Sequence, residues 1–180
     1  IKVAHVEAGI RSDDWTMPEE RNRMVTDSIS YYFFTTSENA NQNLKNSGIS
    51  DDRIFFVGNT MIDTLLGNMK RFCKPTFWKE LKLSEENYFV LTLHRPDNVD
   101  ETKKFIQMLE VVSKGSRGLP VVYPVHPRAA KNLTELSGFA PNIQFVDPQP
   151  YLEFNFLVRN SKAVITDSGV ITEEATVMGI

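Results

Sequence analysis

The stretch IKVAHVEAGIRSDDWTMPEERNR, residues 1–23, carries the pattern from which the fold is predicted. Its first six residues are mostly apolar and are typical of a buried strand, while residues 16–29 have the apolar spacing of a helix. Thr16 is the expected N-cap of this helix, with Glu19 completing a capping box and Pro18 in the first turn. The stretch therefore predicts a strand, a charged turn and a helix in succession.

The same unit recurs along the rest of the chain. Further strands are predicted at the apolar segments 31–36, 53–57, 88–93, 120–125, 143–146 and 163–166. Helices are predicted between and after them at residues 37–46, 60–72, 101–113, 129–136, 151–160 and 171–178. Apolar strands that alternate with helices are typical of parallel sheets covered by helices. The predicted fold class is therefore α/β.

A segment without a clear strand or long helix pattern divides the chain into two parts. Residues 73–87 hold a proline and an acidic turn, and we interpret them as the join between two domains, 1–72 and 88–180. The chain begins at Ile1, inside a strand pattern, and ends at Ile180, directly after a helix pattern. We therefore expect an internal piece of a longer protein, with both domains incomplete.

The composition narrows the class of protein. A formal net charge of -3 is unlike the basic surface typical of nucleic-acid binding. No apolar run is long enough to span a membrane and no signal peptide is visible, so the cytoplasm is the expected location. Cys73 is the only cysteine, which excludes a disulfide framework. No clustered spacing of histidines and carboxylates indicates a metal site.

Polar side chains follow several of the predicted strands. His94 and His126 each end a strand, and ligands of parallel α/β sheets bind at that edge. The segment TDSGVITEE, residues 166–174, brings Ser168 and Gly169 to the start of a helix, where free N–H groups attract a diphosphate. Ordinary loops at the histidines and a simple helix cap at Ser168 would explain the same patterns.

Carboxylates are the candidates for proton transfer and sugar binding. Glu7 and Glu19 could face one cleft as acid and base; the structural alternatives are an ion pair between Glu7 and Arg11 and a capping box at Glu19. Glu174 is expected in the first turn of the last helix, where it could bind a ribose diol or complement the helix dipole. Ser168 lacks the G-x-S-x-G elbow of a serine hydrolase.

Seven segments carry a family resemblance. They are HVEAGIRS (5–12), MPEERNR (17–23), FVGNTMIDTL (56–65), LTLHRPDNVD (91–100), YPVHP (123–127), FVDPQPYLEF (145–154) and TDSGVITEEA (166–175). Taken in order, they resemble the non-hydrolysing UDP-N-acetylglucosamine 2-epimerase family. The resemblance implies a GT-B architecture, with two Rossmann-like halves and the active site in the cleft between them. It also implies a homodimer that interconverts UDP-GlcNAc and UDP-ManNAc for cell-surface polysaccharides, without a metal or redox cofactor.

The resemblance further implies a mechanism and residue roles. UDP is eliminated across C1–C2 to give a 2-acetamidoglucal, and it adds back after protonation on the opposite face. Glu7 and Glu19 match the catalytic carboxylates of the family, and His94 matches the histidine that assists the UDP leaving group. The implied substrate contacts are His126, Ser168 and Gly169 at the diphosphate, Phe154 at the uracil and Glu174 at the ribose, with Arg95 as a further neighbour.

Two departures from the family pattern matter. Val170 stands where the family has a second glycine, and a β-branched residue resists φ > 0 and close approach. Residues 1–180 also lack the N-terminal segment of the family, with its glycine-rich nucleotide loop and a further catalytic aspartate, and the C-terminal closing segment. We therefore expect this piece to be inactive on its own.

Three other functions fit much of the same pattern. A hydrolysing 2-epimerase would release ManNAc and UDP. A GT-B glycosyltransferase would need an acceptor and would leave its donor unepimerised. A non-catalytic protein would bind the nucleotide sugar without turnover.

Overall fold

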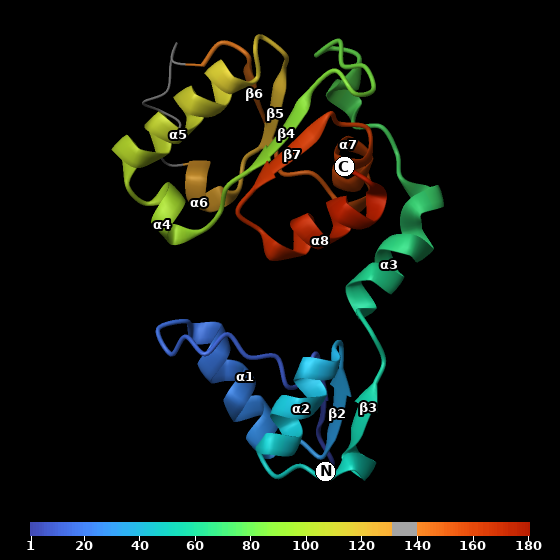
Figure 1. The fold of residues 1–180 in the computed structure, drawn as a ribbon. Helices are drawn as coiled ribbons and strands as arrows, with labels where there is room; N and C mark the ends of the chain where they lie inside the picture. Colours follow the sequence, from blue (N-terminus) through green and yellow to red (C-terminus); the bar gives the residue numbers. More distant parts are fainter. Residues whose placement is uncertain (131–139) are drawn as a thin grey trace. The chain divides into compact units, whose positions relative to one another are not determined.

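The computed structural model of the protein describes residues 1–130 and 140–180. They form two compact units, Ile1–Thr64 and Leu65–Ile180, each built on its own parallel sheet (Figure 1). The α/β class with two parallel sheets is therefore confirmed. The predicted join at residues 73–87 falls inside the second unit, and the domain limits 1–72 and 88–180 stay predictions.

The first unit contains a sheet with the strand order β1-β2-β3. Its elements are β1 (Ala4–Val6), α1 (Pro18–Ile29), β2 (Tyr32–Thr35), α2 (Glu38–Asn46), the 3-10 turn Asp51–Arg53, β3 (Ile54–Phe56) and the start of α3 (Thr60–Asn68). The core consists of Ala8, Phe33 and Leu44. The prediction that the first strand is buried is wrong, since Val6 is 53% exposed. The reason is that β1 lies at an edge of the sheet, whereas the core centres on Phe33 of the middle strand.

Local hydrogen bonds decide where the helices of this unit begin. Ser37, the first residue of the predicted helix 37–46, caps α2, because its hydroxyl accepts a hydrogen bond from a backbone N–H of the first turn at 3.2 Å. The capping box predicted at Thr16 and Glu19 is wrong. Helix α1 begins at Pro18, and the Thr16 hydroxyl donates instead to Oδ1 of Asp14 at 2.6 Å. The hydroxyl expected to cap the helix is therefore hydrogen-bonded to the carboxylate of Asp14.

The second unit is built on a sheet with the strand order β6-β5-β4-β7. Its elements after α3 are the 3-10 turns Met69–Arg71 and Thr76–Trp78, β4 (Phe89–Thr92), α4 (Pro96–Val99), α5 (Thr102–Gly115), β5 (Val121–Pro124), α6 (Pro127–Ala130), β6 (Ile143–Val146), α7 (Tyr151–Arg159), β7 (Ala163–Thr166) and α8 (Gly169–Met178). The bounds of β6 and β7 are those predicted. The predicted helix at 129–136 falls mostly on residues 131–139, outside the described residues. None of the helices in the described ranges has the length and hydrophobicity that crossing a bilayer requires.

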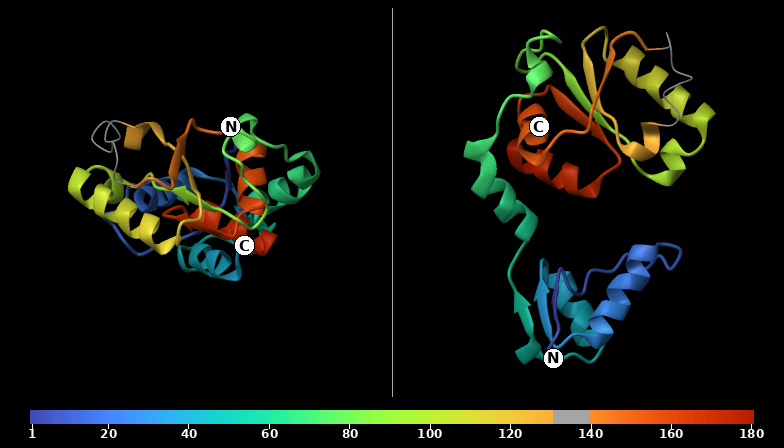
Figure 2. Two further views of the ribbon diagram at one scale, coloured as in Figure 1. Left: turned by 90° about the horizontal axis from the view of Figure 1, so that it is seen from above. Right: turned by 180° about the vertical axis from the view of Figure 1, so that it is seen from behind.

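Helices cover both faces of this second sheet. Helices α5 and α6 lie on one face, and α7 and α8 lie on the other, as the view from behind also shows (Figure 1 and Figure 2). Alternate residues of the strands point to opposite faces, so that Leu91 packs with Phe105 of α5 whereas Val90 packs with Leu157 of α7. Burial on both faces explains why these strands are apolar without alternation.

Gly9 and Gly48 offer a matched test of packing in the first unit. Their φ values are +76° and +82°, so alanine at either position adopts a left-handed backbone that costs about 1–2 kcal/mol. A Cβ atom at Gly9 would in addition clash with the carbonyl oxygen of Ala40, whereas at Gly48 it would meet nothing within 4 Å. We expect Gly9→Ala to lower the free energy of unfolding by about 2 kcal/mol more than Gly48→Ala. Urea titration followed at the amide signals of β2 measures this difference, and equal losses would contradict the close contact between this turn and α2.

Candidate active site

A pocket lies at the carboxyl edge of the sheet in the second unit. Its volume is about 330 Å³, and its lining includes residues that follow β4, β5 and β7. Four of the predicted site residues line it: His94, His126, Phe154 and Ser168. The ring centroids of His94 and His126 are 6.0 Å apart. The parallel order of the strands thus brings together residues that are distant in the sequence.

A buried carboxylate, absent from the predicted site residues, holds His94. The Nδ1 atom of His94 lies 2.6 Å from Oδ1 of Asp167, whose side chain is 8% exposed. Asp167 also accepts hydrogen bonds from the backbone N–H groups of His94 and Arg95 and from the Asn98 side chain. Burial raises the pKa of Asp167, but these hydrogen bonds and the adjacent ring outweigh it and lower the pKa below its ordinary value. Asp167 is therefore a carboxylate at neutral pH.

The start of α8 is open to a ligand. The helix begins at Gly169, two residues earlier than predicted, and Ser168 caps it, because its Oγ accepts a hydrogen bond from the N–H of Ile171 at 3.4 Å. A Cβ atom at Gly169 would meet nothing within 4 Å. Val170 has a helical conformation without positive φ and is 43% exposed, so its β-branched side chain causes no backbone strain here.

Gly169, Glu174 and Arg95 are not among the residues that line the pocket. Glu174 is 5% exposed and accepts a hydrogen bond from the Tyr151 hydroxyl at 2.8 Å. Burial, then this hydrogen bond and the charge of Glu174, raise the pKa of Tyr151 to about 12. The predicted place of Glu174 in the first turn of the helix is wrong, because α8 starts at Gly169. The side chain of Arg95 is exposed and has no hydrogen-bond or ion-pair partner among residues 1–130 and 140–180.

The two candidate acid–base residues lie in the first unit. Glu7 follows β1 directly and has a φ of +65°, a region that residues other than glycine rarely occupy. Such a conformation costs about 1–3 kcal/mol and is typical of functional sites. Within the described ranges, neither the side-chain carboxylate of the half-buried Glu7 nor that of the exposed Glu19 has a hydrogen-bond or ion-pair partner. The ion pair of Glu7 with Arg11, one alternative from the sequence, is thus not formed.

Two buried carboxylates on α1 organise the turn after β1. Asp27 lies 2.6 Å from both Nδ1 of His5 and Nη2 of Arg11, and it accepts a hydrogen bond from the backbone N–H of the glycine in that turn. Glu20 accepts hydrogen bonds from the backbone N–H and the hydroxyl of Ser12, and the backbone N–H is the largest cause that lowers the pKa of Glu20. Neither Asp27 nor Glu20 is among the site residues predicted from the sequence. Their spacing of seven, which places them on one face of a helix, is the signal that could have revealed them.

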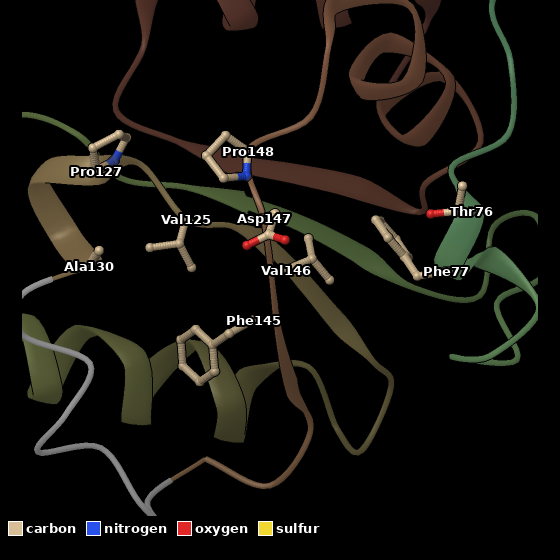
Figure 3. A pocket seen from close by; sticks show the side chains of 9 residues that line it. All are labelled: Thr76, Phe77, Val125, Pro127, Ala130, Phe145, Val146, Asp147 and Pro148. Carbon is tan, nitrogen blue, oxygen red and sulfur yellow. The ribbon is translucent and has the colours of Figure 1, made fainter.

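A second hollow in the same unit contains none of the predicted site residues. Its volume is about 710 Å³, and Thr76, Phe77, Val125, Pro127, Ala130, Phe145, Val146, Asp147 and Pro148 line it. Figure 3 shows Phe145 and Phe77 on opposite sides of Asp147. The lining is mostly apolar, and Asp147 is its single charged side chain among the described residues. A diphosphate would be repelled here, so the smaller pocket is the better candidate.

Comparison with known proteins decides the family. The family model described as UDP-N-acetylglucosamine 2-epimerase matches residues 1–180. The chain belongs to the UDP-N-acetylglucosamine 2-epimerase family.

Relatives within this family are similar over the full chain. It is 38% identical to a UDP-N-acetylglucosamine 2-epimerase of Methanocaldococcus jannaschii, covering 100% of this chain and 52% of that protein. It is 36% identical to a UDP-2,3-diacetamido-2,3-dideoxy-D-glucuronate 2-epimerase of Pseudomonas aeruginosa, covering 99% and 50%. The crystal structure of the Methanocaldococcus jannaschii UDP-GlcNAc 2-epimerase in complex with UDP-GlcNAc and UDP is similar with a TM-score of 0.82, at 39% identity, covering 100% and 52%. The chain thus spans about half the length of the relatives that it matches.

Asp27 and Asp51 provide matched ion pairs in the first unit. Asp27→Ala leaves Arg11 and His5, whose side chains are 13% and 14% exposed, without their carboxylate. We expect it to lower the free energy of unfolding of this unit by about 3 kcal/mol or more. Asp51→Ala removes the exposed pair with Lys45 and should cost less than about 1 kcal/mol. Hydrogen exchange of the β2 amides measures both values, and similar small losses would show that Asp27 does not hold the turn.

Proposed function

We propose that the whole protein interconverts UDP-GlcNAc and UDP-ManNAc by inverting the configuration at C2 of the sugar. The observation that carries the proposal is the pocket of the second unit, where His94, His126, Phe154 and Ser168 surround an open helix start. Membership of the UDP-N-acetylglucosamine 2-epimerase family supports the choice of reaction.

The chemistry of the sugar sets the order of the proposed steps. The C2–H bond is not next to a carbonyl group, so direct removal and return of its proton would be very costly. A base instead takes the C2 proton while the C1–O bond breaks, and UDP leaves with the electron pair of that bond. The new C1=C2 double bond gives 2-acetamidoglucal. A proton then reaches C2 on the opposite face and a UDP oxygen re-forms the bond to C1, so no oxidant or reductant is consumed.

Glu7 and Glu19 are the proposed acid and base. A carboxylate without a hydrogen-bonding partner keeps its lone pairs for the substrate, and Glu7 and Glu19 both meet this condition within the described ranges. The left-handed backbone at Glu7 further supports a functional role, because residues other than glycine rarely occupy this region and such conformations are common at functional sites.

The proposed UDP site uses a different set of residues. His126 and Ser168, which line the pocket, would bind the diphosphate together with Gly169 at the start of α8, where the free N–H groups and the helix dipole favour an anion. His94 would assist departure of UDP, and Phe154 would pack against the uracil. Glu174 is the proposed ribose ligand, which requires the Tyr151 hydroxyl to share or yield its hydrogen bond, and Arg95 is a proposed neighbour of the diphosphate.

The wider role is part of the same proposal. We place the whole protein in the cytoplasm as a homodimer that supplies precursors of cell-surface polysaccharides. The 180-residue chain alone is proposed to be inactive, since it spans about half of its relatives.

A deuterium experiment tests the proposed reaction. The whole protein, incubated with UDP-GlcNAc in D₂O, should form UDP-ManNAc that carries deuterium at C2, detected by NMR and mass spectrometry. Glu7→Gln and Glu19→Gln should each reduce kcat by about 10²–10⁴-fold, because loss of a positioned acid or base has effects of that size. Glu38→Gln, an exposed carboxylate on α2, is the matched control and should retain full activity. Undiminished turnover in both Glu variants would refute their assignment.

The products separate the other functions. Free ManNAc with UDP would indicate the hydrolysing reaction, and transfer only to an added acceptor would indicate a glycosyltransferase. UDP binding without turnover, unaffected by either Glu variant, would indicate a binding protein. Epimerisation of UDP-2,3-diacetamido-2,3-dideoxy-D-glucuronate but not of UDP-GlcNAc would keep the reaction and replace the substrate, as the name of the Pseudomonas aeruginosa relative suggests.

A further inference from the structure

We propose that Asp167 is a positioning residue for His94: it keeps a proton on Nδ1 of the ring and leaves Nε2 for a ligand in the pocket. This geometry lies entirely within the second unit. Only the effect on turnover rests on the proposed function, while the state of the ring can be tested without it.

Strand pairing places the two side chains together. Thr92 of β4 is the register partner of Thr166 of β7, and their Oγ1 atoms are 2.7 Å apart. The backbone N–H of Asp167 donates to the carbonyl of Thr92 at 3.3 Å. The residue that follows β7 therefore lies beside the turn that follows β4, where His94 is the second residue. A side chain that is anchored at two adjacent strand ends has little freedom to move.

The direction of the hydrogen bond between His94 and Asp167 determines which ring nitrogen carries the proton. Both oxygens of Asp167 are occupied by donors, with the N–H of Arg95 at 2.9 Å and the amide of Asn98 at 3.1 Å on Oδ2. An ionised carboxylate can only accept hydrogen bonds, so Nδ1 of His94, at 2.6 Å from Oδ1, must be the donor. The neutral ring then has its lone pair on Nε2.

In the proposed reaction, the ring of His94 would carry a proton and would be held in one orientation by Asp167. With Nδ1 occupied, Nε2 is the only ring atom that can exchange a proton with the departing diphosphate. When the ring also carries a proton on Nε2, it can give that proton to the diphosphate oxygen that takes the electron pair of the C1–O bond. The neutral ring that remains has its lone pair on Nε2 and takes the proton back when that bond re-forms. A ring with the opposite tautomer would have no lone pair on Nε2 to receive the proton.

Two substitutions separate this role from simple support of the loop. Asp167→Asn keeps the shape and one acceptor oxygen, but its NH₂ group can donate to Nδ1, which reverses the polarity of the contact. Asn98→Ala is the matched control, because it removes a hydrogen bond to the same carboxylate without touching the ring.

NMR of the histidine rings reads the proton position directly. The ¹⁵N ring signals that disappear in a His94→Gln variant are those of His94. At a pH at which the ring is neutral, His94 should show a protonated Nδ1 and an unprotonated Nε2 in the wild type and in Asn98→Ala. Asp167→Asn should move the proton to Nε2. A protonated Nε2 in the neutral wild-type ring would overturn the proposal even if Asp167→Asn did not fold.

Kinetics of the whole protein give the second readout. Asp167→Asn should reduce kcat by about 10²-fold or more with little change in KM, whereas Asn98→Ala should stay within about threefold of the wild type. Equal losses in both variants would mean that Asp167 only supports the loop. A wild-type protein without epimerase activity would refute the proposed function, and the NMR result would still decide the role of Asp167.

Discussion

The parallel pairing of neighbouring strand ends is the constraint on which the candidate UDP site depends. Because Thr92 and Thr166 are register partners, the residues that follow β4 and β7 come within hydrogen-bonding distance of each other. Asp167 then accepts hydrogen bonds from the turn that follows β4, and the next residue, Ser168, caps α8. One buried carboxylate therefore fixes the ring of His94 and sits next to an open helix start.

The first unit uses the same principle with a carboxylate from a helix. Asp27 of α1 draws His5 and Arg11 towards itself and so shapes the turn in which Glu7 adopts its left-handed backbone. In both units, buried aspartates are fully engaged in holding neighbours, whereas the proposed acid and base, Glu7 and Glu19, are left without partners in the described ranges. An active site needs both kinds of group: buried charges that hold their neighbours in position, and charges without partners that react with the substrate.

Periodicity and local chemistry predicted much of the fold, and sequence distance explains what they missed. The bounds of β6 and β7 and the Ser37 cap follow from patterns a few residues long. The pair of Asp27 with His5 spans 22 residues, and that of Asp167 with His94 spans 73, so no local pattern contains them. The helix cap predicted at Thr16 is wrong because the Thr16 hydroxyl donates a hydrogen bond to the carboxylate of Asp14 and does not cap the helix. Four predicted site residues do share a pocket, because strand ends of a parallel sheet meet at one edge.

The most direct test of the proposed UDP site is a titration of UDP into the ¹⁵N-labelled protein, followed at the ring signals of the histidines. His94 and His126 line the pocket, whereas His5 is held by Asp27 in the first unit. We predict that UDP shifts the signals of His94 and His126 together, with a single dissociation constant, and leaves that of His5 nearly unchanged. Unchanged signals of both His94 and His126 at saturating UDP would contradict the placement of the nucleotide at this edge of the sheet.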